Sequence, residues 1–100
     1  MELAVFIQSL SASQPPAGCH ACLQALWQER AGHWDRAHEL VQDLDSPEAA
    51  WVHAYLHRRE GDDWNADYWY RRAGRRRPAL SLDQEWEQIV SFLLKPGGQV

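Results

Sequence analysis

The chain has 100 residues, which is the length of a single domain with one modest core. Hydrophobic residues make up 45% of it and charged residues 24%, so its composition is that of a folded protein and excludes a disordered chain. The net charge of -4 excludes a protein that binds polyanions through its bulk charge, although five arginines and no acids lie between residues 71 and 77.

Helical patterns dominate the first half of the chain, and no alternating strand pattern occurs. The first predicted helix covers residues 2–10, and the segment 11–16 interrupts it. A second helix is predicted at 18–31, ended by Gly32, and a third at 34–44. The residues expected to face inward are Leu3, Phe6, Ile7 and Leu10 in the first helix, Cys19, Cys22, Leu23, Leu26 and Trp27 in the second, and Ala37, Leu40, Val41 and Leu44 in the third.

The second half restarts at Ser46 and Pro47, which are typical of an N-cap and a first helical position. Helices are predicted at 47–60, 64–76 and 83–94, followed by a flexible tail at 96–100. Their inward stripes are Ala66, Trp69, Tyr70 and Ala73 in the fifth helix, and Trp86, Ile89, Val90 and Leu93 in the sixth. The expected fold class is therefore all-α, with about six helices and no sheet.

No run of 18 apolar residues predicts a transmembrane helix. The N-terminal segment MELAVFIQSLSASQ lacks the positive region of a signal peptide, so we expect a cytoplasmic protein that does not contact membranes. Two cysteines are too few for a disulfide framework.

An internal repeat emerges when the chain is shifted by 29 residues against itself. Gly32 then pairs with Gly61, and Ala37 pairs with Ala66. Each pair of helices has a glycine at its turn and an alanine five residues later, where a small side chain lets two helices approach closely. The pattern favours stacked antiparallel helical hairpins.

The segments QERAGHWDRAHELVQDL and RREGDDWNADYWYRRAGRRRP resemble the turn and second helix of tetratricopeptide or Sel1-like repeats. The period of 29 is shorter than the 34 or more residues of those families. The stretch from WVHAYLHRREGD to NADYWYRRAG is also similar to a group of small bacterial and fungal proteins of unestablished activity, which implies no function. The repeat resemblance implies one domain at 1–95, with repeats at about 19–45 and 47–78 and capping helices at 2–10 and 83–94.

The same resemblance implies a protein-binding groove lined by the first helix of each repeat. Its candidate residues are Trp51, His53, Tyr55 and His57, with Arg58 and Tyr68 at the margin. The expected function is a non-catalytic protein that binds a protein partner or itself, for instance as a homodimer, with no cofactor.

The alternative is a nucleic-acid or anion-binding module that uses the arginine run, namely Arg71, Arg72, Arg75, Arg76 and Arg77. Two observations weigh against it. Cations are favoured at a helix C-terminus, and Asp67 stands four residues before Arg71, at the spacing of an ordinary ion pair.

Two further motifs are read as structural. Cys19 and Cys22 have the spacing of a redox pair, but no strand precedes them and both lie on an apolar stripe, which favours core cysteines. His53 and His57 share a helix face and could hold a metal, yet a polar groove edge or an exposed face is the preferred interpretation, and no metal site is expected. No catalytic constellation is recognisable, so we expect no enzyme activity.

Overall fold

The computed structural model describes residues 1–95, and the regular structure within this part of the chain is entirely helical. The expected all-α class without a sheet is confirmed there. The predicted tail at 96–100 lies outside the described residues. The elements are α1 (Leu3–Gln8), the 3-10 turn η1 (Ser9–Ser11), α2 (Ala21–Arg30), α3 (Trp34–Val41), α4 (Pro47–Arg59), α5 (Asp63–Arg72) and α6 (Leu82–Leu94).

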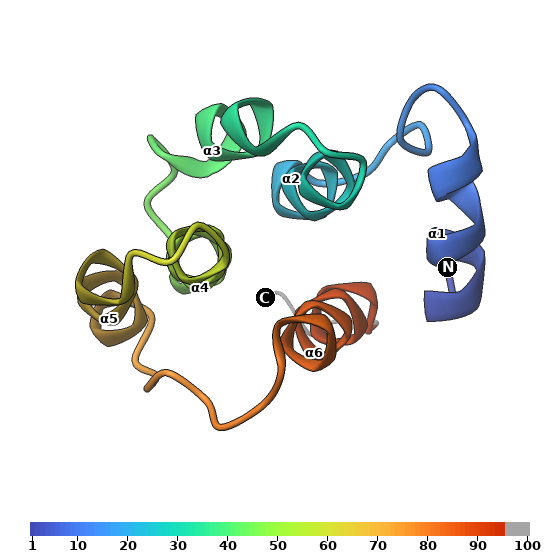
Figure 1. Ribbon diagram of the computed structural model, residues 1–100. Helices are drawn as coiled ribbons and strands as arrows, with labels where there is room; N and C mark the ends of the chain where they lie inside the picture. The colour runs from blue at the N-terminus through green and yellow to red at the C-terminus, as the bar shows by residue number, and fades with distance from the viewer. Residues whose placement is uncertain (96–100) are drawn as a thin grey trace.

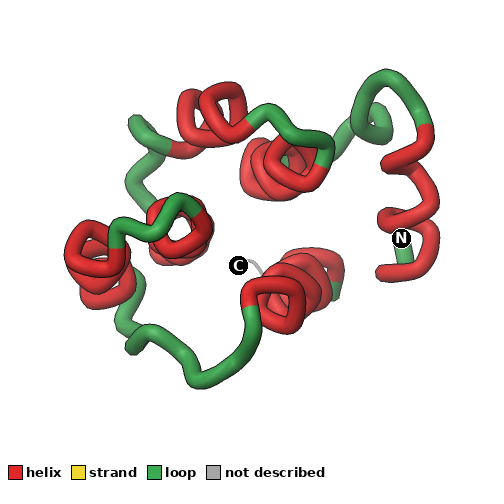
Figure 2. The backbone as a smooth tube through the Cα atoms, viewed as in Figure 1, coloured by secondary structure: helices red, strands yellow, loops and turns green. Residues whose placement is uncertain are grey.

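Consecutive helices form two antiparallel pairs. The most extensive contacts join α2 to α3 and α4 to α5, and α3 also contacts α4. Figure 1 shows α2 and α4 toward the centre of the molecule, with α3 and α5 outside them. The tube in Figure 2 shows short connections within each pair and a longer loop from α5 to α6.

The sixth helix packs against α2, α4 and α1. Its predicted inward stripe is confirmed, since Trp86, Ile89 and Val90 are 0% exposed and Leu93 is 3% exposed. The indole Nε1 of Trp86 donates a hydrogen bond to the Leu26 carbonyl oxygen at 3.0 Å. The sixth helix lies beside the first helices of both pairs (Figure 1).

The two hairpin turns are built in the same way. Gly32 and Gly61 have φ angles of 95° and 88°, a region that glycine enters without a Cβ clash. In the first turn, the Gly32 N–H bonds to the Glu29 carbonyl and the His33 N–H bonds to the Gln28 carbonyl; the second turn repeats this pattern 29 residues later. Ala37 and Ala66 are both fully buried, as the repeat pattern predicts.

The fifth helix ends at Arg72, four residues before the end predicted from the sequence. Gly74 has a φ of 73°, and its N–H bonds to the Arg71 carbonyl while the Arg75 N–H bonds to the Tyr70 carbonyl. This is the same glycine-ended turn a third time. Arg75, Arg76 and Arg77 therefore lie in a loop and not on the last turn of a helix.

No helix within residues 1–95 combines the length and the apolar character needed to cross a membrane.

Candidate functional site

The residues predicted to line a groove on α4 lie in the interior. Trp51 and His53 are each 4% exposed, Tyr55 is 0% and His57 is 7%. The cause is packing on both sides of α4, by α6 on one side and by α3 and α5 on the other. These four α4 side chains are thus not open to a partner in this structure, which corrects the groove predicted from the sequence.

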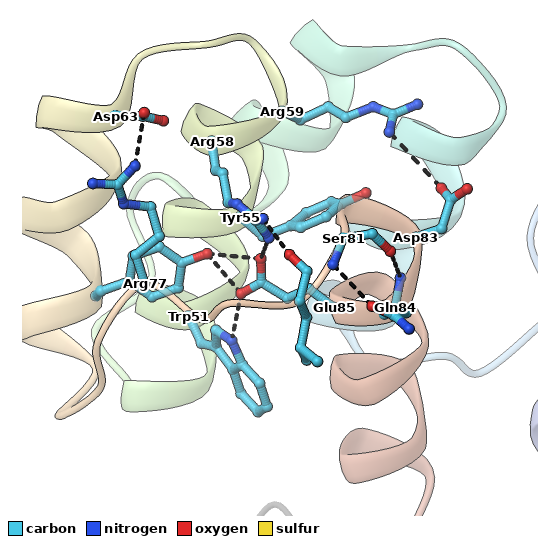
Figure 3. Close-up of polar contacts among 12 residues, drawn as sticks. Trp51, Tyr55, Arg58, Arg59, Asp63, Arg77, Ser81, Asp83, Gln84 and Glu85 are labelled. Atoms are coloured by element: carbon cyan, nitrogen blue, oxygen red, sulfur yellow. Dashed lines mark hydrogen bonds and ion pairs between the residues drawn. The ribbon is translucent and has the colours of Figure 1, made fainter.

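Around Glu85, on α6, polar side chains form a buried network (Figure 3). Glu85 is 0% exposed, and its carboxylate accepts hydrogen bonds from Trp51 Nε1 at 3.2 Å and from Arg58 at 2.8 Å. The Tyr70 hydroxyl lies 2.7 Å and 2.6 Å from the two carboxylate oxygens. Burial, followed by the hydrogen bond to Glu85, raises the pKa of Tyr70. The network ties α4, α5 and α6 together, and Arg58, which is partly buried, takes part in it through Glu85.

A second buried carboxylate joins α2 to α4. Glu29 is 6% exposed and accepts a hydrogen bond from the Tyr55 hydroxyl at 2.9 Å. Arg59 Nε lies 3.2 Å from its other oxygen. Burial raises the pKa of Glu29, and the neighbouring Tyr55 and Arg59 partly offset that effect. Each of the two buried carboxylates is paired with an arginine, because a buried charge without a partner would cost a large desolvation energy.

The arginine run divides into residues with and without acidic partners. Arg77 bonds to Asp63 at 2.7 Å and to Asp67 at 3.0 Å, so Asp67 pairs with Arg77 and not with Arg71 as expected. The Arg75 guanidinium lies 3.4 Å from the centroid of the Trp51 ring, a cation–π contact. Within the described chain, Arg71 and Arg76 form no ion pair.

The loop after α5 borders an open groove of about 570 Å³. Four arginines of the run line it, Arg71, Arg75, Arg76 and Arg77, together with Arg58. Asp67 and Tyr70 also contribute to its wall. The groove thus presents several arginine side chains, and carboxylates neutralise only some of them.

The outer face of α5 carries an exposed strip formed by Trp64, Tyr68 and Arg72, which follow one another at a spacing of four residues. Trp64 is 81% exposed and Tyr68 is 39% exposed. Arg72 donates a hydrogen bond to the Tyr68 hydroxyl at 3.2 Å. We call these three residues the α5 strip. Arg72 also borders a small hollow of about 180 Å³ between α5 and the α3–α4 turn, where Leu44 is 40% exposed.

Three histidines from two helices meet in a cluster. His38 of α3 joins His53 and His57 of α4, and one ring nitrogen from each lies within 4.8 Å of the other two. His38 Nε2 is 2.9 Å from His53 Nε2, and His57 Nδ1 is 2.7 Å from a Glu60 carboxylate oxygen. Burial, with help from the other two histidines, lowers the pKa of His53 to about 3. Burial also lowers the pKa of His38.

Both cysteines are free thiols. Cys22 is 0% exposed, which confirms a core position, whereas Cys19 is only partly buried and lies before α2 begins. Burial raises the pKa of Cys22 to about 12 and also raises the pKa of Cys19. Because the thiolate is the reactive form, both shifts oppose redox chemistry.

Sequence reasoning missed Glu85, Glu29 and His38. Glu85 precedes Ile89 by four residues and therefore lies on the apolar stripe of α6, a position at which an acid signals a buried partner. His38 stands on a different helix from His53, so no spacing along the chain could bring them together.

No family model, curated protein or solved structure matches this chain. The resemblance to helical repeat families therefore stays a prediction.

Proposed function

We propose that the protein is a non-catalytic helical module that binds a protein partner through the α5 strip. The observation that carries the proposal is the exposure of Trp64, 81%, in a chain whose Trp51 and Trp86 are 4% and 0% exposed. Leaving a tryptophan in water forfeits a large apolar burial, which binding would recover.

The composition and the shape of this surface support the proposal. Tryptophan, tyrosine and arginine are the residues most enriched at the energetic centres of protein interfaces. The hydrogen bond between Arg72 and Tyr68 orders the polar end of the strip. The adjoining hollow beside Leu44 could take an apolar side chain of the partner. A partner with an apolar pocket for Trp64 and a carboxylate for Arg72 would complement this face.

The test compares proteins captured from lysate of the source cells by the wild type and by the double variant Trp64→Ala/Tyr68→Ala. Val5→Ala/Ile7→Ala is the matched control, because those side chains are 51% and 39% exposed on α1. A captured protein is then purified, and its Kd is measured with each variant. We expect the α5 double variant to weaken binding at least about 30-fold and the control to leave it unchanged.

Equal affinity of wild type and α5 double variant for every captured partner would refute the proposal. Self-association is tested in the same series by sedimentation over a range of concentrations. A dimer that Trp64→Ala dissociates would identify the partner as a second copy of this chain.

A second function, anion or nucleic-acid binding, is favoured by one observation: Arg71 and Arg76 line the groove of about 570 Å³ beside the loop after α5 and have no acidic partners in the described chain. Arg71→Glu/Arg76→Glu should then abolish a salt-dependent affinity for a mixed RNA pool. Arg36→Glu is the control, since Arg36 is exposed on α3. If the wild type does not bind RNA at low salt, this function is excluded.

The family relationship, the absence of catalysis and the cytoplasmic location are proposed on the sequence alone.

A further inference from the structure

We propose that His38, His53 and His57 form a binding site for a first-row divalent transition metal such as Zn²⁺. The site is independent of the α5 strip and does not rest on the proposed protein partner. Three imidazoles with no thiolate nearby are a ligand set suited to zinc, copper or nickel.

The spacing of the three rings fits one shared ion. Their centroids are 4.6, 4.9 and 5.3 Å apart. A metal about 2.0–2.1 Å from each ligating nitrogen would lie about 3.2 Å from each ring centroid, and two rings subtending 90–110° would then be about 4.5–5.2 Å apart. The three ring separations are therefore close to those that one shared ion requires, and one nitrogen of each ring already lies within 4.8 Å of the other two.

The contact between His57 and Glu60 favours the tautomer of neutral His57 that a metal ligand needs. The Glu60 carboxylate 2.7 Å from His57 Nδ1 accepts the proton on that nitrogen, which leaves the lone pair of Nε2 free. A carboxylate behind the imidazole is the usual second layer of a histidine metal site, where it orients the ring and raises its basicity.

The other two histidines share a single hydrogen bond between their Nε2 atoms. Two neutral rings can do so only if one Nε2 is protonated and the other accepts. When a metal binds both Nε2 atoms, the donating ring moves its proton to Nδ1, so no net proton is released. His53 Nδ1 is meanwhile buried without a hydrogen-bond partner, in contrast to the fully paired Glu85 carboxylate.

Two tryptophans hold the ligands in place. Trp69 stacks on His53 with ring centroids 3.8 Å apart, and Trp34 stacks on His38 at 5.0 Å. Trp34 is itself fixed by a hydrogen bond from its Nε1 to the Leu56 carbonyl at 2.7 Å. The ligands thus come from α3 and α4 on rigid supports, and a bound ion would clamp the first helical pair to the second. His38 is the least buried of the three and marks the side from which an ion enters.

The experiment titrates Zn²⁺, and separately Co²⁺ and Cu²⁺, into chelator-treated protein without a polyhistidine tag. We expect one equivalent to bind, with a Co²⁺ ligand-field spectrum, and Cu²⁺ to quench tryptophan fluorescence because Trp34 and Trp69 stack on two ligands. At a Zn²⁺ concentration about 100 times Kd, Tm should rise by about 10 °C.

His38→Gln and His53→Gln should each weaken Zn²⁺ binding by at least tenfold, and Glu60→Gln by about 10–100-fold. His33→Gln is the matched control, since His33 is exposed and precedes α3. His38→Gln is the variant least expected to disturb folding, because His38 is only partly buried. Circular dichroism of this variant checks that its helical content equals that of the wild type. The proposal is overturned if the wild type binds no stoichiometric metal. It also fails if His33→Gln weakens binding as much as His38→Gln, or if Cys19→Ser alone abolishes it.

Discussion

At the scale of the residue, the buried charge of Glu85 is central to the core. A carboxylate with 0% exposure is tolerated because Arg58 neutralises it and because Tyr70 and Trp51 direct hydrogen bonds at its oxygens. Such a network contributes little net stability relative to apolar packing, but it becomes costly when one member is removed.

Glu85→Ala should therefore lower the free energy of unfolding by roughly 3 kcal/mol, because Arg58 would lose its carboxylate and the Tyr70 hydroxyl its partner. Denaturant unfolding followed by circular dichroism measures the change. Glu87→Ala is the control, since Glu87 is exposed on the same helix and its loss should change stability by less than about 0.5 kcal/mol. Equal effects of the two substitutions would show that the network is not formed.

At the scale of the element, glycines decide where helices end. The apolar periodicity of the fifth helix predicts a continuation to residue 76, with Pro78 as the residue that stops it. Gly74, with a φ of 73°, ends it at Arg72 instead. The turns at Gly32 and Gly61 are predictable because each glycine stands just after an apolar stripe. Gly74 instead lies within a run of arginines that a helix would also accept.

Gly74→Ala should lower the free energy of unfolding by about 1–2 kcal/mol through backbone conformation alone. No atom beyond the adjoining residues lies within 4 Å of the position a Cβ would take, so a clash with the rest of the described chain does not contribute. Gly74→Asn should lose less, because asparagine tolerates this conformation better. Thermal unfolding of the two variants measures these losses. An alanine variant as stable as the wild type would contradict the role given to the backbone conformation of Gly74.

The elements and the apolar stripe of α6 could be predicted because they depend on local spacing, and Ala66 and Tyr70 are buried as the stripe of the fifth helix predicts. The site could not be predicted in the same way. The sequence predicts Trp51 and Tyr55 as open groove residues, because nothing in it indicates that α6 lies against α4. The pairing of Asp67 with Arg77 depends on the loop that Gly74 creates. The groove error concerns a contact between elements distant in the chain, whereas the error at Asp67 follows from the local end of α5.

At the scale of the whole molecule, α6 completes the core by covering α2 and α4. Its Trp86 packs beneath the guanidinium of Arg30, which lies 4.1 Å from the ring centroid, and beside Phe6 of α1. One helix therefore holds both helical pairs and the N-terminal helix together. The face that a two-repeat stack would offer to a peptide is occupied by the chain itself.

Trp86→Ala should accordingly lower the free energy of unfolding by about 3–5 kcal/mol, since it removes the largest side chain that is fully buried in the core. Trp64→Ala changes the same residue type on the exposed α5 strip and should stay within about 0.5 kcal/mol of wild type. Urea unfolding of both variants gives the comparison. A large loss for Trp64→Ala would mean that the strip is a structural surface.

The most direct test of where the accessible aromatic surface lies is oxidative footprinting of the six tryptophans, read by mass spectrometry. We predict that Trp64 is oxidised fastest, because it is 81% exposed, and that Trp51 and Trp86 are protected, at 4% and 0% exposure. If Trp51 reacted as fast as Trp64, α6 would not cover α4, and the partner surface would have to be sought in the groove of the first helices instead of on the α5 strip.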